Sequence, residues 1–250
     1  MKDTPQTHEK PPIVAFASTK GGVGKTTLAY SLATEITRRL RKGLAGDSAS
    51  QLSGGPEFLT SCIDADPNRT LTEAIRITGM PDIQIMAADG ETLLDVLRKA
   101  QATSSVVLID LEGTANQAML YACGKADLVL IPAQPSRFDV LEAVKTAGVV
   151  RQAADLVGRE IGYRVVLSRT PVLRQRVAEH SRSQFMKAGL PMLNTELVQR
   201  TAFQTMTYSG EPPFAQEPTG GAARNVEALT DEVIAILGMA LLAVTAAQAA

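Results

Sequence analysis

The sequence predicts an α/β domain, built as a three-layer sandwich with a mainly parallel, twisted central sheet flanked by helices. Short apolar runs alternate with segments that carry apolar residues at helical spacing along most of the chain. The length of 250 residues suffices for one sizeable α/β domain and is too short for two ordinary ones. A glycine-rich turn joins the first apolar run to the first helical pattern, as phosphate-binding folds require.

Composition narrows the class of protein further. A hydrophobic content of 45% with 20% charged residues is typical of a globular chain. The formal net charge of −1 excludes a global field that attracts nucleic acid, so any such binding needs a local patch. Cys62 and Cys123 are too few for a disulfide framework or a cysteine-rich metal site. Residues 1–12 are polar without an apolar core, which predicts a flexible tail, a single domain over 13–250 and a cytoplasmic location.

The first elements have the clearest pattern. Residues 13–17 are apolar and typical of a buried strand, and apolar side chains at helical spacing run from Leu28 to Leu40. Basic residues and Gly43 mark the end of this helix. Residues 44–57 are rich in Gly, Ser and Ala and predict an insertion longer than the usual helix-to-strand connection. This insertion is either a loop special to one group of relatives or an irregularity of the sequence.

The alternation of strand and helix patterns continues to the C-terminus, which favours a parallel sheet covered on both faces. Apolar runs predict strands over residues 58–63, 83–87, 106–110, 128–131 and 163–167, and a short last strand within 191–197. Helical spacing predicts helices over residues 71–77, 93–97, 117–123, 137–157, 174–188 and 222–250. Prolines predict a turn at 132–136 and a loop at 210–221.

The glycine-rich turn reads S-T-K-G-G-V-G-K-T-T over residues 18–27. Glycines let backbone N–H groups surround phosphate oxygens, and the start of the following helix adds partial positive charge. We expect Lys25 to reach the β- and γ-phosphates of ATP and the Thr26 hydroxyl to bind Mg²⁺. The residues predicted to bind the nucleotide are Gly21, Gly22, Val23, Gly24, Lys25, Thr26 and Thr27.

Three aspartates are predicted to complete this site. Asp110 ends an apolar strand, and Asp64 and Asp66 end another in the sequence D-A-D-P-N. In an open α/β sheet, ligands gather beyond the carboxyl ends of the strands, so all three are expected to lie near the phosphate loop. Asp110 is expected to hold Mg²⁺ through water.

These motifs resemble those of the ParA/MinD family of ATPases, whose fold is P-loop NTPase-like. The turn has Thr19 where the ordinary phosphate loop has its first glycine, and Lys20 precedes the two glycines. This K-G-G-x-G-K-T-T form resembles the family's deviant Walker A loop. D-A-D-P-N resembles the family's D-x-D-P-Q motif, with Asn68 in place of Gln, and residues 131–139 resemble its proline-containing motif. The resemblance covers about residues 13–237 and is strongest to small ParA-type partition proteins and to VirC-type proteins.

The resemblance implies roles for several residues. Asp66 is expected to orient the attacking water, and Asp64 to lie in the outer shell of the metal. Lys20 is expected to cross into a partner subunit and contact its nucleotide, giving a homodimer that sandwiches two ATP molecules. Weak ATP hydrolysis is expected to be stimulated by DNA and by a small ParB-like adaptor protein.

After Asp110 the chain reads L-E-G-T, which departs from the turn that many relatives have. Two interpretations stay open for Glu112. It either assists the attacking water or is a solvent-facing turn residue, and the second is favoured.

Basic residues gather in one part of the chain. Residues 151–200 hold nine Lys or Arg against four Asp or Glu, although the whole chain is slightly acidic. Such a concentration fits sequence-independent contact with DNA phosphates and predicts association with the nucleoid, and a solvated basic helix face is the alternative. The candidates for DNA contact are Arg174, Arg176, Arg182 and Arg200.

The C-terminal run 233–250 carries no charge over 18 residues, near the minimum for a membrane span. Its apolar residues recur at helical spacing and it has no basic flank, so we expect a packed helix without stable membrane insertion.

The leading functional interpretation is an ATPase that drives partition or positioning of a plasmid, a chromosome or another cargo. The first alternative is a VirC-like recruitment factor in conjugative DNA transfer. The second is a metabolic or metal-carrier ATPase of the same fold, which the absence of a Cys-x-x-Cys motif disfavours.

Overall fold

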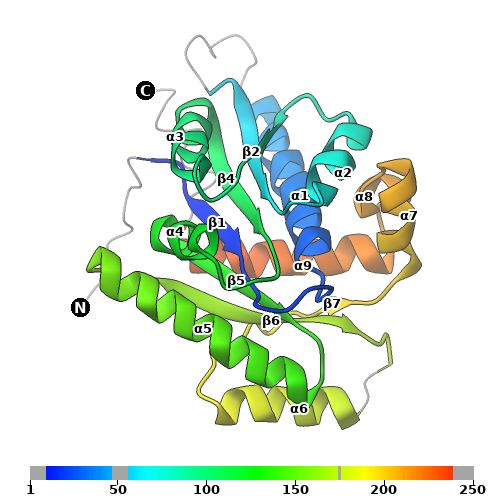
Figure 1. Cartoon of the computed structure of the whole chain (residues 1–250). Helices are drawn as coiled ribbons and strands as arrows, with labels where there is room; N and C mark the ends of the chain where they lie inside the picture. The colour runs from blue at the N-terminus through cyan, green and yellow to red at the C-terminus, as the bar shows by residue number, and fades with distance from the viewer. Residues whose placement is uncertain (1–9, 47–55, 174–175, 239–250) are drawn as a thin grey trace, which may run out of the picture.

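Seven parallel strands form one sheet at the centre of the computed structural model, which describes residues 10–46, 56–173 and 176–238 (Figure 1). Along the sheet their order is β3-β2-β4-β1-β5-β6-β7, so the first strand of the chain lies in the middle. The strands are β1 (Ile13–Phe16), β2 (Phe58–Ala65), β3 (Ile83–Ala87), β4 (Ser104–Leu111), β5 (Leu128–Ala133), β6 (Gly162–Thr170) and β7 (Leu197–Val198). All the strand pairs are parallel, as the predicted fold class requires.

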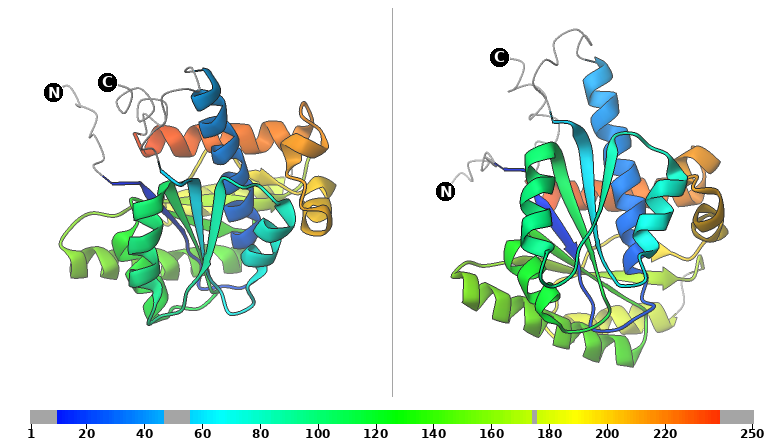
Figure 2. Two further views of the ribbon diagram at one scale, coloured as in Figure 1. Left: turned by 90° about the horizontal axis from the view of Figure 1, so that it is seen from above. Right: turned by 45° about the horizontal axis from the view of Figure 1, so that its top comes forward.

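Helices cover both faces of the sheet. Successive side chains of a strand therefore point alternately into two hydrophobic cores, one on each face. In β1, Ile13 and Ala15 pack into one core, whereas Val14 and Phe16 pack into the other, as the two-residue period of a strand dictates. One face carries α3 (Leu93–Thr103), α4 (Gln117–Lys125), α5 (Arg137–Val157) and α6 (Arg176–Lys187). The other face carries α1 (Lys25–Gly46), α2 (Thr70–Thr78), α7 (Thr201–Ser209) and α9 (Gly221–Ile236), with the short α8 (Pro213–Gln216) before α9. The views in Figure 2 show the sheet between these two layers.

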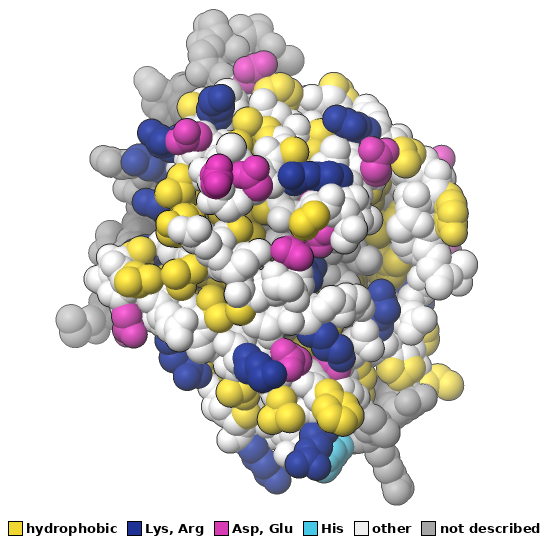
Figure 3. All heavy atoms as spheres, viewed as in Figure 1, with side chains coloured by type: hydrophobic (Ala, Val, Ile, Leu, Met, Phe, Trp, Pro, Cys, Tyr) yellow, Lys and Arg dark blue, Asp and Glu magenta, His cyan; other side chains and the backbone are white. Residues whose placement is uncertain are grey.

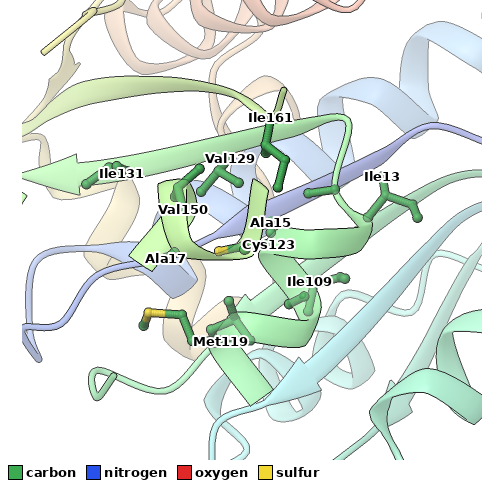
Figure 4. Packing of buried hydrophobic residues seen from close by; sticks show 14 of the residues in the cluster. Ile13, Ala15, Ala17, Ile109, Met119, Cys123, Val129, Ile131, Val150 and Ile161 are labelled. Atoms are coloured by element: carbon green, nitrogen blue, oxygen red, sulfur yellow. The ribbon is translucent and has the colours of Figure 1, made fainter. Parts of the chain in front are cut away.

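The core on the α4 and α5 side is filled by small and branched side chains. Met119 and Cys123 of α4 and Val150 of α5 meet strand residues such as Ile109 and Val129 (Figure 4). Cys123 is thus a packing residue, and Cys62 is also buried as a free thiol. With apolar groups on both sheet faces, the strands form a rigid frame for the loops at their ends.

Several boundaries differ from the sequence prediction. Helix α1 continues to Gly46, so residues 44–46 of the predicted insertion are helical, and residues 47–55 lie outside the described part. Strand β5 includes Pro132 and Ala133, which were predicted as part of a turn. The strand tolerates Pro132 because the Ala17 N–H pairs with the Leu130 carbonyl where β1 ends, so β1 does not continue beside Pro132.

The C-terminal third holds elements that the sequence pattern did not predict. Helix α7 was missed because only Phe203 and Met206 form its buried stripe, and α8 falls within the loop predicted at 210–221. The predicted last strand is reduced to β7, with a single bridge between Val165 and Met192 before it. Of the predicted terminal helix, residues 221–236 are helical and residues 239–250 lie outside the described part. Among the described residues, the search finds no helix with the length and hydropathy to cross a membrane.

Candidate functional site

The ends of three adjacent strands place the predicted phosphate-site residues at one edge of the sheet. The register aligns Asp64 of β2 with Asp110 of β4, and Asp110 with Phe16 of β1. The phosphate loop starts just beyond Phe16 and ends where α1 begins, at Lys25. Because β1 lies between β4 and β5, the loop is at the point where the chain turns from one half of the sheet to the other. This is where open α/β sheets bind ligands.

The backbone of the phosphate loop depends on two of its glycines and on supports from distant strands. Gly22 and Gly24 have φ values of 73° and 96°, which side chains other than glycine rarely adopt. The Ser168 hydroxyl at the end of β6 donates to the Val23 carbonyl at 2.6 Å. The Gln134 side-chain amide, just after β5, donates to the Gly22 carbonyl at 3.2 Å. The loop is therefore held open in a fixed shape before any phosphate binds.

Lys25 is a nearly buried ammonium among carboxylates. Its side chain lies at the start of α1, and Nζ approaches the Lys20 carbonyl at 3.4 Å. Burial lowers the pKa of Lys25, and the negative charges of Asp110, Asp66 and Glu112 oppose this shift. A cation with few neutralising contacts at a helix start is suited to bind phosphate oxygens.

Asp110 and Thr26 together provide a site that fits Mg²⁺. The Thr26 hydroxyl donates to Asp110 Oδ2 at 2.7 Å. Asp110 is 1% exposed, and its Oδ1 has no hydrogen-bond partner in the described part of the chain. Burial raises the pKa of Asp110 to about 7, against the hydrogen bond from Thr26, and the negative charge of Asp64 adds to the increase. A buried carboxylate oxygen without a partner beside a threonine hydroxyl matches the oxygen ligands of Mg²⁺.

Within the described residues, no group of three or more His, Cys, Asp or Glu side chains gathers as a metal site.

Asp64 has a different local role from Asp110. It is fully buried, and its Oδ2 accepts hydrogen bonds from the Thr72 amide and hydroxyl, both at 2.8 Å. Its Oδ1 accepts from the Asp66 amide at 3.1 Å. Asp64 thus ties the D-A-D-P-N loop to the first turn of α2, and its predicted place around the metal stays a prediction. Asp66 is partly exposed at the end of this loop, and it is close enough to influence Lys25.

The start of the phosphate loop lies against α5 of the same chain. Lys20 Nζ is 2.9 Å from Asp139 Oδ2, with the Lys20 side chain 38% exposed and that of Asp139 2% exposed. One turn further along α5, Glu142 Oε2 accepts from the Thr19 hydroxyl at 2.8 Å. The Thr19 amide donates to the Thr146 hydroxyl at 3.1 Å. In this single chain, the lysine predicted to reach a partner is therefore held by its own helix.

The sequence analysis missed three residues that shape the loop. Asp139 had a local signal, because Ser136 and Asp139 form an N-terminal capping pair for α5. Gly113 lies so close to the loop that an added Cβ would be 2.8 Å from the Gly21 nitrogen. Ser168 and Gly113 carried no local signal, because their contacts with the loop join distant parts of the chain.

The predicted DNA-contact residues have different surroundings. Arg182 donates to the carbonyls of Leu193 and Asn194 at 3.0 and 3.1 Å, and it pairs with Glu196 at 3.0 Å, so its guanidinium is engaged within the fold. Arg200 lines a cavity of about 310 Å³ beyond β7, and its Nε is buried without a partner among the described residues. Arg174 lies outside the described residues, and Arg176 begins α6.

Comparisons with known proteins find chains that are similar over most of this length. Residues 14–214 match the family model described as the CobQ/CobB/MinD/ParA nucleotide binding domain. Protein ParA of Rhizobium radiobacter is 27% identical over 220 residues, covering 86% of this chain and 91% of that protein. The maintenance of carboxysome distribution protein A of Halothiobacillus neapolitanus is 23% identical over 229 residues, covering 88% and 95%. The ATP complex of a McdA variant from Cyanothece has a TM-score of 0.69 at 16% identity, covering 89% of this chain and 96% of that one.

Proposed function

The chain belongs to the CobQ/CobB/MinD/ParA family of nucleotide-binding domains, and on that premise we propose that it is a partition or positioning ATPase controlled by ATP-dependent dimerisation. One observation carries this proposal. The phosphate loop has two lysines with separate surroundings, because Lys25 is nearly buried among the site carboxylates and Lys20 is more than one-third exposed against α5. On this basis we assign Lys25 to the bound nucleotide and Lys20 to a partner subunit.

Nucleotide binding and hydrolysis follow from the inner part of the site. Lys25 and the loop amides would bind the phosphates, and Thr26 and Asp110 would hold Mg²⁺, which neutralises phosphate charge when bound. Asp66 is expected to orient the water that attacks the γ-phosphate. The loop amides are fixed in advance by Ser168 and Gln134, so the site needs little rearrangement to stabilise the developing charge.

Lys20 would link nucleotide binding to assembly. To reach a second subunit it must leave Asp139, which holds it through one contact at 2.9 Å. Because the lysine end of this pair is partly exposed, the pair is worth only about 1 kcal/mol or less. The triphosphate of a partner's nucleotide carries more negative charge than one carboxylate, so it can compete for Lys20.

The test compares Lys20→Gln with Asp139→Asn, and exposed Lys99→Gln on α3 serves as the control. Lys20→Gln should keep ATP binding and lose the ATP-dependent dimer in light scattering. Asp139→Asn frees the lysine from its anchor and should give dimers at lower ATP concentration. An ATP-dependent dimer that survives Lys20→Gln would contradict the assigned role of Lys20, and absence of ATP binding by the unaltered protein would contradict the function itself.

The remaining parts of the proposal concern what the dimer acts on. Similarity to ParA and to a carboxysome distribution protein supports a role in moving or spacing a cargo such as a plasmid. We include non-specific DNA as the surface on which the dimer acts, and a small adaptor protein as the activator of hydrolysis. The excess of basic residues over 151–200 supports the DNA part.

A further inference from the structure

Glu112 is a carboxylate at the phosphate edge that the proposed function leaves unused. It follows directly after β4, two residues beyond Asp110. Side chains two residues apart on a strand point to the same face of the sheet. Glu112 is therefore expected on the same face as Asp110. The β2–β4 register pairs Asp64 with Asp110 and Ala65 with Leu111. Asp66 and Glu112 each follow directly after the last paired residue of their strand.

The surroundings of Glu112 connect it with the phosphate site. Both Asp66 and Glu112 lie just beyond the carboxyl ends of their strands, on the side of the sheet where the phosphate loop lies. Glu112 is partly buried, and its Oε2 accepts from the Asn116 side-chain amide at 3.2 Å. The next residue, Gly113, packs directly on the Gly21 backbone. Glu112 is thus a partly exposed residue that begins a loop packed against the phosphate loop.

Asn116 fixes this arrangement from the other side. Its Oδ1 accepts from the Met119 amide and so caps α4, while its amide nitrogen approaches Glu112. A carboxylate that is bonded through one oxygen to a helix cap keeps its other oxygen for a ligand. The loop between β4 and α4 is therefore anchored at Gly113 and at Asn116, and Glu112 is bonded to the second of these anchors.

We propose that Glu112 is a second catalytic carboxylate of the ATPase, which accepts a hydrogen bond from the attacking water alongside Asp66. The proposal rests on the function above, in which Lys25 binds the γ-phosphate. In the reaction, the water oxygen forms a bond to the γ-phosphorus, and the bond to the bridging oxygen breaks with its electron pair passing to ADP. Both water protons end on the released phosphate, so that ATP⁴⁻ and H₂O give ADP³⁻ and H₂PO₄⁻. Two fixed acceptors restrict the water to one orientation, which lowers the entropic part of the barrier.

The experiment uses the full chain with Glu112→Gln and Glu112→Ala, and Glu160→Gln as the matched control. Glu160 is exposed just before β6, at the opposite edge of the sheet. Turnover of ATP, affinity for a fluorescent ATP analogue and thermal stability are measured for each protein. Glu112→Gln should lower kcat roughly tenfold or more, as loss of a positioned acceptor does, while analogue affinity and stability stay at the level of the control. Added formate should restore part of the turnover of Glu112→Ala, because a small carboxylate fits the vacated space.

The possible outcomes distinguish failure of the role proposed for Glu112 from failure of the proposed function on which it rests. Turnover that is unchanged in Glu112→Gln, or tighter analogue binding without loss of turnover, overturns the role of Glu112 and leaves the ATPase intact. A loss of turnover that follows a loss of stability and is not restored by formate also overturns it, because the residue is then structural. If the unaltered protein binds no ATP, the proposed function itself has failed.

Discussion

Among the site residues, Asp110 most directly makes an unfavourable contribution to the free energy of folding. Its carboxyl is 1% exposed and has one oxygen without a partner among the described residues, and burial raises its pKa to about 7. Without nucleotide, the native protein therefore keeps this proton at pH values where the unfolded chain has released it. A bound Mg²⁺ would compensate by supplying the missing positive charge. The carboxyl proposed to hold Mg²⁺ is thus also one whose burial destabilises the native protein.

This gives a prediction for the pH dependence of stability. Because the folded pKa is above the ordinary value of 3.8, the free energy of unfolding falls as pH rises from about 4 to about 7 and then levels off. Over that interval the loss from this one group amounts to about 4 kcal/mol at most. In Asp110→Asn the loss should be absent.

The check is to measure the free energy of urea unfolding of the unaltered protein and of Asp110→Asn, both without nucleotide, at about pH 5 and about pH 8. Other titrating groups contribute equally in the two proteins, so the difference between them reports Asp110. An equal decrease in the free energy of unfolding of the two proteins between these pH values would contradict the prediction.

At the scale of single residues, the sequence predicted what local motifs encode. Lys25, Thr26 and Asp110 lie where the phosphate-loop pattern and the strand end place them. Local patterns could not show that Lys20 lies on Asp139, because that contact depends on how a loop at one end of β1 meets a helix 119 residues away. Ser168 was equally hidden, since its contact with Val23 spans 145 residues.

At the scale of elements, the loop from β4 to α4 is shaped by its contact with the phosphate loop. A Cβ on Gly113 would lie 2.8 Å from the Gly21 nitrogen and 2.9 Å from its Cα. Both neighbours are backbone atoms, which cannot rotate away. The two loops must therefore move together, and the position of one fixes the other.

We accordingly predict that Gly113→Ala weakens ATP binding while the fold remains. Relieving such an overlap costs about 1–3 kcal/mol, and if the phosphate loop absorbs the strain, nucleotide affinity falls about tenfold or more. Gly148→Ala in α5 is the matched control, because a Cβ there meets nothing within 4 Å, and it should slightly stabilise the helix. Titration with a fluorescent ATP analogue, beside circular dichroism, distinguishes the two. Equal affinity in both variants would show that the contact between the loops is not needed.

Element boundaries were predicted well where periodicity is strong and less well where tertiary contacts decide. Strand β5 runs through Pro132 because β1 has already ended beside it, which no local pattern shows. Helix α7 was missed because only Phe203 and Met206 form its buried stripe. Its end is fixed from outside by Tyr30, whose hydroxyl bonds to Thr78 at 2.5 Å and to the Gly210 carbonyl at 2.7 Å. Both cases are tertiary effects that outweigh local preference.

At the scale of the whole molecule, charge is unevenly distributed. The segment 151–200 spans the end of α5, then β6, α6 and β7, and Lys and Arg side chains are visible over the α5 and α6 region in Figure 3. Exposed apolar side chains accompany them there, including Phe138 and Leu141 of α5 and Met186 of α6. A binding surface for a polyanion on this side is compatible with a chain that is slightly acidic overall.

The corresponding prediction concerns DNA. The protein with ATP should bind duplexes of any sequence, with an affinity that falls steeply as salt increases, and Arg174→Ala with Arg176→Ala should weaken binding equally for all sequences. Arg76→Ala on α2 is the control, because this arginine is exposed and lies outside the basic segment. Arg182→Ala should instead lower thermal stability, since three partners within the fold lose their hydrogen bonds. Equal binding with ADP, or no binding at low salt, would contradict this prediction.

The central place of β1 also determines the order in which this protein can be made. The strand is synthesised well before its neighbours β4 and β5, which begin at Ser104 and Leu128. Until those residues have been synthesised, the growing chain has no sheet in which to insert Ile13–Phe16. Pairing over such sequence distances is slow, and a newly made strand with open edges is exposed to aggregation in the meantime. The phosphate loop is therefore translated before β5 and β6, whose ends support it through Gln134 and Ser168, and it reaches its final shape only after both have emerged.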